Sequence, residues 1–220
     1  MPIVFDFDGV LANSEPIHER AFHDVVDPMG LALSHETFVN RFVGKSDLVC
    51  FRMLLDDHGR AYTEEDLLAL RRRKTEAFNA RVAAGEAEAF PGALDLVRAA
   101  AERGPVGVCS GSLSEVVRPV LERFGVADLV RTLVGAERVQ RVKPDPEGYL
   151  LACRELGAEP SECAAIEDSP TGIRAAKSAG LRCLAVAHSF PAERLDEADA
   201  VFGRIGEIAL EDLLGSGVGG

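Results

Sequence analysis

The sequence predicts an α/β protein with a parallel sheet that helices cover on both faces, interrupted near its start by an all-helical segment. Short apolar runs, typical of buried strands, alternate with helical patterns over the later part of the 220 residues. The stretch from residue 14 to residue 86 instead carries helical patterns and no clear buried strand. These two observations favour a doubly wound core with an inserted helical unit.

Four short apolar runs are expected to form buried strands, because each is rich in β-branched or small apolar residues. They are Ile3 to Phe5, Val106 to Cys109, Cys163 to Ile166 and Leu181 to Ala187. Helices are expected at residues 93–103, 114–124, 146–156 and 171–179. A glycine follows each of these helices, where a left-handed C-terminal cap favours it: Gly104, Gly125, Gly157 and Gly180.

The helical unit is expected to interrupt the α/β unit just after its first strand. Its best helical segments are residues 15–26, 46–58 and 63–84, and Thr63 opens the last one as a capping residue. The basic run at residues 71–74 is interpreted as a solvated helix face, because acidic residues flank it. Phe90-Pro91-Gly92 marks the return to the core. The predicted boundaries are 1–13 and 87–220 for the core domain and 14–86 for the helical domain.

Composition restricts the partners that we expect. The chain has 24 Lys and Arg against 36 Asp and Glu, a net charge of -12, which argues against general nucleic-acid binding but leaves a small anionic substrate possible. No apolar run reaches the roughly 18 residues of a membrane span, and the apolar start is too short for a signal peptide. The five cysteines include no CxxC pair and are expected to be buried, reduced thiols of a cytoplasmic protein.

An acidic pair follows the first predicted strand. Asp6 and Asp8 stand one residue apart, with Gly9 next to them. Ligands of a parallel sheet bind beyond the carboxyl ends of its strands, and two neighbouring carboxylates repel each other unless a cation or a proton lies between them. A strand-end turn capped by acids is the alternative, and it is common for a single Asp. Two Asp residues followed by Gly favour a functional site.

Three later features stand at comparable places. Ser110-Gly111-Ser112 follows a predicted strand and opens a helix, which suits a phosphate, although Ser is also a routine helix cap. Lys143 precedes a proline before another helix, where a lone Lys is usually a solvated charge. Glu167 and Asp168 directly follow a buried run, and oxygen ligands of this kind suit Mg²⁺.

These motifs, in this order, resemble those of the haloacid dehalogenase superfamily, in particular its phosphatase and phosphomutase branch with a helical cap after the first strand. The resemblance covers essentially the whole chain. It implies a Rossmann-like, doubly wound parallel core with an inserted all-helical cap domain. It also implies a Mg²⁺-dependent enzyme that acts on a small phosphorylated metabolite and is a monomer or weak dimer.

The resemblance further implies a role for each motif. Asp6 is expected to be the nucleophile that takes the phosphoryl group, and Asp8 the general acid and then base. The phosphate is expected to bind to Ser110 and Lys143, with the amides of Gly9 and Gly111 nearby. Mg²⁺ is expected to be held by Asp6, the Asp8 carbonyl and Asp168, with Glu167 assisting directly or through water.

The acid at Asp8 favours phosphate esters, since members that cleave carbon–halogen bonds or phosphonates lack it. The segment from Asp8 to Phe22 resembles the β-phosphoglucomutase and sugar-phosphatase group, although Asn13 stands where Asp is usual. Three residues are expected to serve the substrate or the cap: His18, Lys45 and Ser112. For His18, a half-buried helix residue facing Phe22 is an equally good interpretation.

Two departures weaken the mutase interpretation. Asp47 is the best match to the position where related mutases carry an Arg for a second phosphate, with Lys45 as the alternative that could replace this Arg, and Leu113 stands where they often carry Lys. A phosphatase of the sugar-phosphate or phosphoglycolate type is therefore favoured. The alternatives are a β-phosphoglucomutase-like enzyme and an inactive binding protein on the same scaffold.

Overall fold

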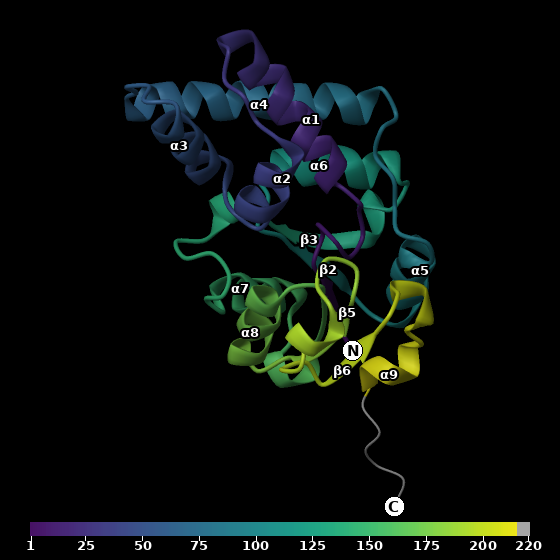
Figure 1. The fold of residues 1–220 in the computed structure, drawn as a ribbon. Helices are drawn as coiled ribbons and strands as arrows, with labels where there is room; N and C mark the ends of the chain where they lie inside the picture. The colour runs from purple at the N-terminus through teal and green to yellow at the C-terminus, as the bar shows by residue number, and fades with distance from the viewer. Residues whose placement is uncertain (215–220) are drawn as a thin grey trace, which may run out of the picture. The chain divides into compact units, whose positions relative to one another are not determined.

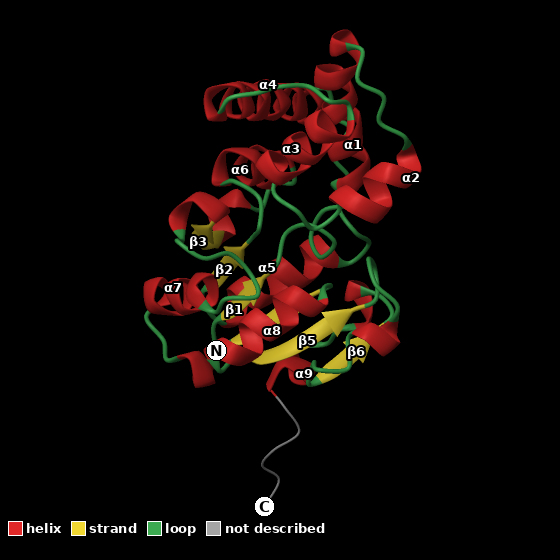
Figure 2. Ribbon diagram, turned by 60° about the vertical axis from the view of Figure 1, so that its left-hand side comes forward, coloured by secondary structure: helices red, strands yellow, loops and turns green. Residues whose placement is uncertain are grey.

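The structure is a computed structural model that describes residues 1–214 (Figures 1 and 2). The chain divides into two compact units, each of which is described by itself. The larger unit combines Met1–Asn13 with the chain from Glu88 onward, and the helical unit is Ser14–Ala87. Among the described residues, no helix has both the length and the apolar character that crossing a membrane requires.

A parallel sheet of six strands forms the centre of the larger unit, in the order β3-β2-β1-β4-β5-β6. The strands are β1 Ile3–Phe5, β2 Val106–Cys109, β3 Val130–Val134, β4 Ala164–Glu167, β5 Arg182–Val186 and β6 Ala200–Phe202. Ile3 of β1 pairs with Val106 of β2 and Ala164 of β4, so these three strands end at one edge. The predicted α/β fold class is confirmed.

Two strands, β3 and β6, are missing from the sequence-based expectation. In β3 the last three residues are buried, whereas Val130 is half-buried and Arg131 is exposed. The sequence therefore shows no continuous apolar run at this strand. The edge strand β6 has three residues, none of them fully buried. Arg131 and Thr132 interrupt the apolar pattern of β3, and the Ala-Val-Phe run of β6 is short and incompletely buried, unlike a strand covered on both faces.

Helices cover both faces of the sheet. They are α5 Ala93–Arg103, α6 Ser114–Arg123, α7 Glu147–Leu156, α8 Pro170–Ala179 and α9 Leu210–Leu214. Right-handed crossovers place α5 and α6 on one face and α7 and α8 on the other. Short 3-10 turns lie at Ala127–Leu129, Ala136–Arg138, Pro160–Glu162, Ala192–Arg194 and Ile205–Glu207.

One of the predicted helix caps is wrong in its geometry. Gly125, Gly157 and Gly180 have the left-handed backbone that was expected. Gly104 instead has an extended backbone with φ 174°. A Cβ there would lie 2.8 Å from the carbonyl oxygen of Met1, so close approach of another segment explains this glycine.

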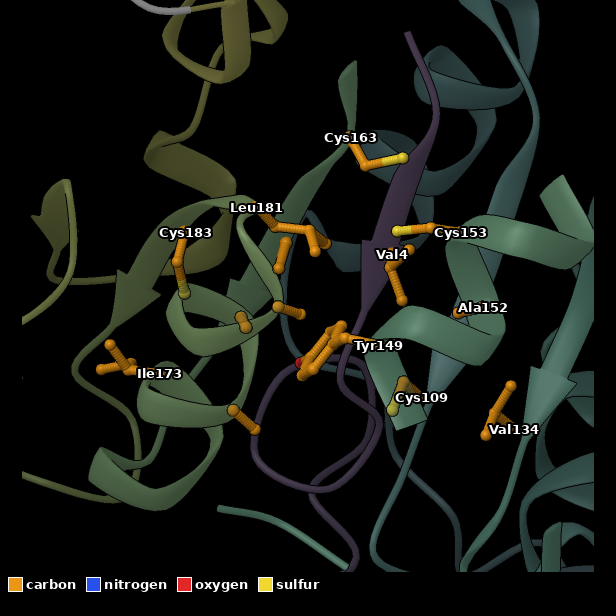
Figure 3. Close-up of a cluster of buried hydrophobic side chains, with 14 of the residues drawn as sticks. Val4, Cys109, Val134, Tyr149, Ala152, Cys153, Cys163, Ile173, Leu181 and Cys183 are labelled. Atoms are coloured by element: carbon orange, nitrogen blue, oxygen red, sulfur yellow. The ribbon is translucent and has the colours of Figure 1, made fainter. Parts of the chain in front are cut away.

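The core beneath α7 and α8 contains Val4, Tyr149 and Ile173 together with many small residues. Figure 3 shows Tyr149 within this cluster, with Cys109, Cys153, Cys163 and Cys183 around it. All five cysteines of the chain are buried free thiols, as predicted. Burial raises the pKa of the Cys109 thiol to about 12, so this thiol is inert at neutral pH.

The helical unit contains α1 Glu15–Val26, α2 His35–Thr37, α3 Asp47–Asp57 and α4 Glu64–Ala83, with a 3-10 turn at Asp27–Met29 and a π-helical turn at Phe38–Phe42. Four aromatic rings form the centre of its core: Phe22, Phe38, Phe42 and Phe51. Thr63 caps α4 through a reciprocal pair of hydrogen bonds with Asp66, as its sequence indicates.

Lys74 corrects the prediction of a solvated basic face at residues 71–74. Its side chain is 1% exposed, although Arg72 and Arg73 are exposed. The Lys74 ammonium donates to Asp47 Oδ1 at 2.9 Å and to His18 Nδ1 at 2.6 Å. Because a buried ammonium is stable only with such partners, the pairing explains how Lys74 turns inward.

Candidate active site

The carboxyl ends of β1, β2 and β4 bring most of the predicted site residues to one edge of the sheet. Asp6 follows β1, and its amide donates to Ile166 O on β4 at 2.9 Å. Ser110 follows β2, and Asp168 follows β4. The chain between β3 and α7 adds Lys143 to the same edge. All of these residues belong to the larger unit.

Lys143 is the cation at the centre of this group. Its ammonium lies 2.5 Å from Asp6 Oδ1 and 2.6 Å from Glu167 Oε1, and it donates to the carbonyl oxygen of Cys109 at 2.9 Å. Burial by itself lowers the pKa of Lys143, but the charges of Asp6 and Glu167 more than offset this and raise that pKa well above its ordinary value. Lys143 therefore stays charged at any physiological pH.

Asp6 is buried beside several other carboxyl groups. Burial, together with the charges of Glu167, Asp168 and Asp8, raises the pKa of Asp6 well above its ordinary value, against the opposing effect of Lys143. A buried carboxyl group with this pKa is unstable as an anion unless more positive charge is supplied. The site is therefore prepared to bind a cation or a proton.

Glu167 is completely buried and uses both carboxylate oxygens fully. Oε1 accepts from Lys143 and from the Tyr149 hydroxyl at 2.8 Å. Oε2 accepts from the Asp168 amide at 3.1 Å and the Ser169 hydroxyl at 3.2 Å. A carboxylate has about four lone-pair positions, so these contacts leave Glu167 little capacity for a direct metal bond.

Asp168 is also buried, and its Oδ2 accepts a short hydrogen bond from the Ser189 hydroxyl. Burial and the charge of Glu167 raise the pKa of Asp168 to about 8, although Ser189 and Lys143 act in the opposite direction. At neutral pH this carboxyl group is therefore mostly protonated when no metal is bound. A bound divalent cation would favour its ionised form.

Asp8 points to the serine residues that follow β2. Its Oδ2 accepts from the Ser112 hydroxyl at 2.7 Å and from the Ser110 hydroxyl at 3.3 Å. The Ser112 amide in turn donates to Ser110 Oγ at 2.9 Å. No protein atom would lie within 4 Å of a Cβ at Gly111, so this turn is open on that side.

The donor set fits a hard divalent cation. Ligand atoms of Asp6, Glu167 and Asp168 all lie within 4.8 Å of one another, and all three residues are buried. Within the described part of this edge, four carboxyl groups, including Asp8, surround the single ammonium of Lys143. Oxygen ligands with an excess of negative charge are the kind that Mg²⁺ prefers. Since the oxygens of Glu167 are already used, Asp6 and Asp168 are the available carboxylate ligands.

Gly9 has a spatial role at this edge. Its amide already donates to Ala12 O at 3.0 Å, which differs from the expectation that this amide would serve the phosphate. Gly9 has φ +81°, and a Cβ there would overlap the Asp168 carboxylate and lie 2.6 Å from Ser189 Oγ. The absence of a side chain at Gly9 therefore lets Asp168 and Ser189 approach the loop.

His18 and Lys45 lie in the helical unit and are described within it. His18 accepts from Lys74, and its ring lies 4.5 Å from that of Phe78, between centroids. Lys45 donates to the carbonyl oxygen of Arg41 at 2.7 Å. Asp47 is an ion-pair partner of the buried Lys74.

Sequence reasoning missed several residues that shape this site. Tyr149 was expected only as part of a helix, and Gly172 only as part of an acidic strand-end motif. A Cβ at Gly172 would overlap the Glu167 carboxylate, so this glycine makes room for it. His188 and Ser189 follow a predicted strand directly, as the other site residues do, and that position was the signal that could have identified them.

The comparisons with known proteins agree with this geometry. A family model described as haloacid dehalogenase-like hydrolase matches residues 3–180. The chain belongs to this family. The predicted family and the predicted hydrolase class are therefore confirmed.

The relatives of the chain include several phosphatases. It is 31% identical to the validoxylamine A 7'-phosphate phosphatase of Streptomyces hygroscopicus subsp. limoneus, over 93% of this chain and 94% of that protein. It is 30% identical to hexitol phosphatase B of Escherichia coli, over 96% of each. Among solved structures, CbbY from Rhodobacter sphaeroides in complex with phosphate matches with a TM-score of 0.87 and 30% identity, over 96% of this chain and 98% of that one.

Proposed function

We propose that this protein is a Mg²⁺-dependent phosphatase that hydrolyses a small phosphorylated metabolite, of the sugar-phosphate or phosphoglycolate type, through an aspartyl-phosphate at Asp6. The observation that carries this proposal is the buried Asp6 carboxylate, held 2.5 Å from the Lys143 ammonium at the end of β1. Phosphatases among the relatives, and the phosphate in the CbbY structure, support the choice of reaction.

In the first step, an oxygen of Asp6 forms a bond to phosphorus while the ester bond to the substrate alcohol breaks. Lys143 holds Oδ1, which leaves Oδ2 as the attacking atom. Asp8 in its protonated form gives its proton to the departing alcohol oxygen. In the second step, water attacks phosphorus and gives a proton to Asp8, and the bond from phosphorus to Asp6 breaks.

The charge at this edge explains why a carboxylate can attack a phosphate. Mg²⁺, held by Asp6, the Asp8 carbonyl and Asp168, would offset the repulsion between the carboxylate and the phosphate oxygens. Lys143 contributes a fixed positive charge. Glu167 keeps the Lys143 ammonium in place rather than serving as a ligand, because its oxygens already accept four hydrogen bonds.

The serine turn supplies donors to the substrate phosphate. In this proposal the hydroxyl of Ser110, the amide of Gly111 and the Lys143 ammonium bind the phosphate oxygens, and Ser112 assists. Both serine hydroxyls contact Asp8 in the structure. A bound phosphate therefore competes with Asp8 for them, and Asp8 is released toward the leaving group.

The helical unit, in this proposal, is the cap that selects the leaving group, with the loop that carries Lys45 as its contribution to the substrate. Asp47 is paired with the buried Lys74 inside this unit, and no Arg stands at its position. A second phosphate has no such partner there. This pairing supports hydrolysis of a monophosphate over a mutase reaction.

A substrate panel tests the proposal. The full chain is incubated with Mg²⁺ and hexose phosphates, hexitol phosphates, phosphoglycolate or nucleotides, and released phosphate is measured. We expect release from at least one ester, loss of release with EDTA, and loss in Asp6→Asn. Clean isomerisation of β-glucose 1-phosphate without phosphate release would favour the mutase. No reaction with any ester, despite bound Mg²⁺, would favour the inactive scaffold.

A further inference from the structure

Two neighbouring side chains at the active edge, His188 and Ser189, have no role in the mechanism above. They follow β5 after Ala187, and the carboxyl end of β5 lies at the same edge of the sheet as that of β4. Ser189 donates to Asp168. His188 is half-buried and contacts three separate segments of the larger unit.

The hydrogen bonds of His188 determine its protonation state. The Ile205 amide donates to His188 Nε2 at 3.3 Å, so Nε2 is the unprotonated nitrogen. Nδ1 lies 2.8 Å from the carbonyl oxygen of Gly9, which can only accept. His188 is therefore neutral, and its Nδ1–H donates to Gly9. The ring also stacks on Phe90, with 4.0 Å between centroids and 21° between planes.

The Gly9 carbonyl belongs to a tight loop that contains Asp8. The amides of Leu11 and Ala12 both donate to Phe7 O, at 2.9 and 3.0 Å. The Gly9 amide donates to Ala12 O, and only its carbonyl points outward to His188. The Val10 amide of the same peptide group donates to Phe7 O at 3.4 Å, so the loop holds this group at its amide and the His188 donor holds it at its carbonyl.

His188 also reaches the returning chain through Phe90. Phe90 donates its amide to Leu11 O at 3.2 Å, and Asn13 donates its amide to Glu88 O at 3.0 Å. The segment that leaves for the helical unit and the segment that returns from it are thus paired inside the larger unit. His188 touches the first through Gly9 and the second through Phe90.

We propose that His188 is a positioning residue for the reaction: its Nδ1–H holds the Gly9 carbonyl and so sets the orientation of the loop that carries Asp6 and Asp8. The expected effect of His188 on kcat rests on the proposed function. The structural content of the inference, a hydrogen bond from His188 to the Gly9 carbonyl of this loop, does not depend on which ester is hydrolysed.

Three substitutions of His188 distinguish the effect of its Nδ1–H donor from the effect of its packing. His188→Asn places an N–H donor close to the position of Nδ1. His188→Gln places its amide near the position of Nε2 instead, and His188→Leu keeps bulk without either nitrogen. We expect kcat to fall about 10- to 100-fold in the Gln and Leu variants with KM nearly unchanged, and to stay within about threefold of the parent in the Asn variant.

Hydrogen exchange of the backbone provides a second readout that needs no activity. Peptides that contain Gly9 to Ala12 are followed in the full chain without substrate, with thermal unfolding as the control for folding. We expect exchange to be about tenfold faster in the Gln and Leu variants than in the parent, and near parental in the Asn variant. Equal behaviour of the Asn and Leu variants, with folding intact, would overturn the inference. If the parent hydrolyses no ester, the proposed function fails and hydrogen exchange alone decides this inference.

Discussion

At the scale of single residues, the site is an unbalanced group of charges. Asp6, Glu167 and Asp168 are buried together, and Lys143 contacts two of them. Glu167 is satisfied by four donors, whereas Asp6 and Asp168 carry raised pKa values. Burial and the neighbouring carboxylates raise the pKa values of Asp6 and Asp168 by more than their hydrogen-bond and ion-pair partners lower them. A cation bound at this edge would therefore stabilise the folded state as well as supply its chemistry.

The raised pKa of Asp168 predicts how stability depends on pH without metal. Its folded pKa of about 8 exceeds its unfolded value, so the stabilisation from protonation is full below about pH 4 and is lost as pH rises through 8. Asp168→Asn does not titrate there. In EDTA, we expect the variant to become progressively more stable relative to the parent between pH 5 and 8, by urea unfolding.

Mg²⁺ is the control for that experiment, because it should stabilise the parent more at pH 8 than at pH 6 and the Asn variant little at either pH. A parent-to-variant difference that is the same at every pH would contradict the raised pKa.

The sequence identified the residues with the strongest chemical signal and missed their supports. Asp6, Ser110, Lys143 and Asp168 are charged or hydroxylic residues at strand ends, and the structure brings them together. Tyr149 and Gly172 act through size and a single hydroxyl from within helices, which no local pattern distinguishes from packing. Lys74 was misinterpreted because acidic residues flank the basic run in the sequence, whereas its partners Asp47 and His18 lie in other helices of the same unit.

At the scale of elements, α8 illustrates how a helix is adapted to the site. It begins at Pro170, and the Ser169 hydroxyl accepts from the Gly172 amide at 3.1 Å. Glu167 lies against this first turn, where the positive end of the helix dipole favours a carboxylate. Gly172 is the residue that leaves space for it.

Gly172→Ala tests this adaptation, because helix propensity and packing predict opposite signs. Propensity alone would stabilise the helix by up to about 1 kcal/mol. The overlap of the added methyl group with Glu167 is expected to outweigh the gain in propensity and to lower the free energy of unfolding by about 1–2 kcal/mol. Phosphatase activity should fall as well. Exposed Ser178, in the same helix, gives the control: Ser178→Ala should be neutral or slightly stabilising. A stabilised Gly172→Ala variant with full activity would show that the carboxylate does not need this space.

Strands were predictable where both faces are buried and not elsewhere. β1, β2, β4 and β5 appear in the sequence as apolar runs. Each predicted strand end lies within one residue of the end in the structure. β3 and β6 depend on pairing with a neighbour, since Arg131 and Val201 are exposed. Tertiary contacts rather than local pattern define these edge strands.

At the scale of the whole molecule, the chain crosses between the two units at two adjacent places. The aromatic cluster of the helical unit is formed by residues between 22 and 70. Ala12 and Ala89 pair as an antiparallel bridge on the side of the larger unit. The crossings are therefore held together by backbone hydrogen bonds that do not involve the inserted helices.

This arrangement predicts that the larger unit folds without the insertion. Replacing residues 14–87 by a two-residue Asn-Gly turn should convert the two crossings into a β-hairpin, since such turns connect antiparallel neighbours. We expect cooperative thermal unfolding, Mg²⁺ binding and slow hydrolysis of an aryl phosphate, with little discrimination among sugar phosphates. A deletion variant that unfolds without cooperativity, while the full chain unfolds normally, would contradict this independence.

The central claim is a covalent phosphoryl group on Asp6, and trapping it is the most direct test. Asp8→Asn removes the proton carrier but leaves the Asp6 oxygen to attack an aryl phosphate, whose leaving group needs little protonation. Mixed with Mg²⁺ and quenched in acid, this variant should accumulate one added phosphoryl group, which peptide mass spectrometry places on Asp6. The double variant with Asp6→Asn should accumulate none. Release of the aryl alcohol by the Asp8→Asn variant with no phosphoryl group on Asp6, or with the group on another residue, would contradict the account.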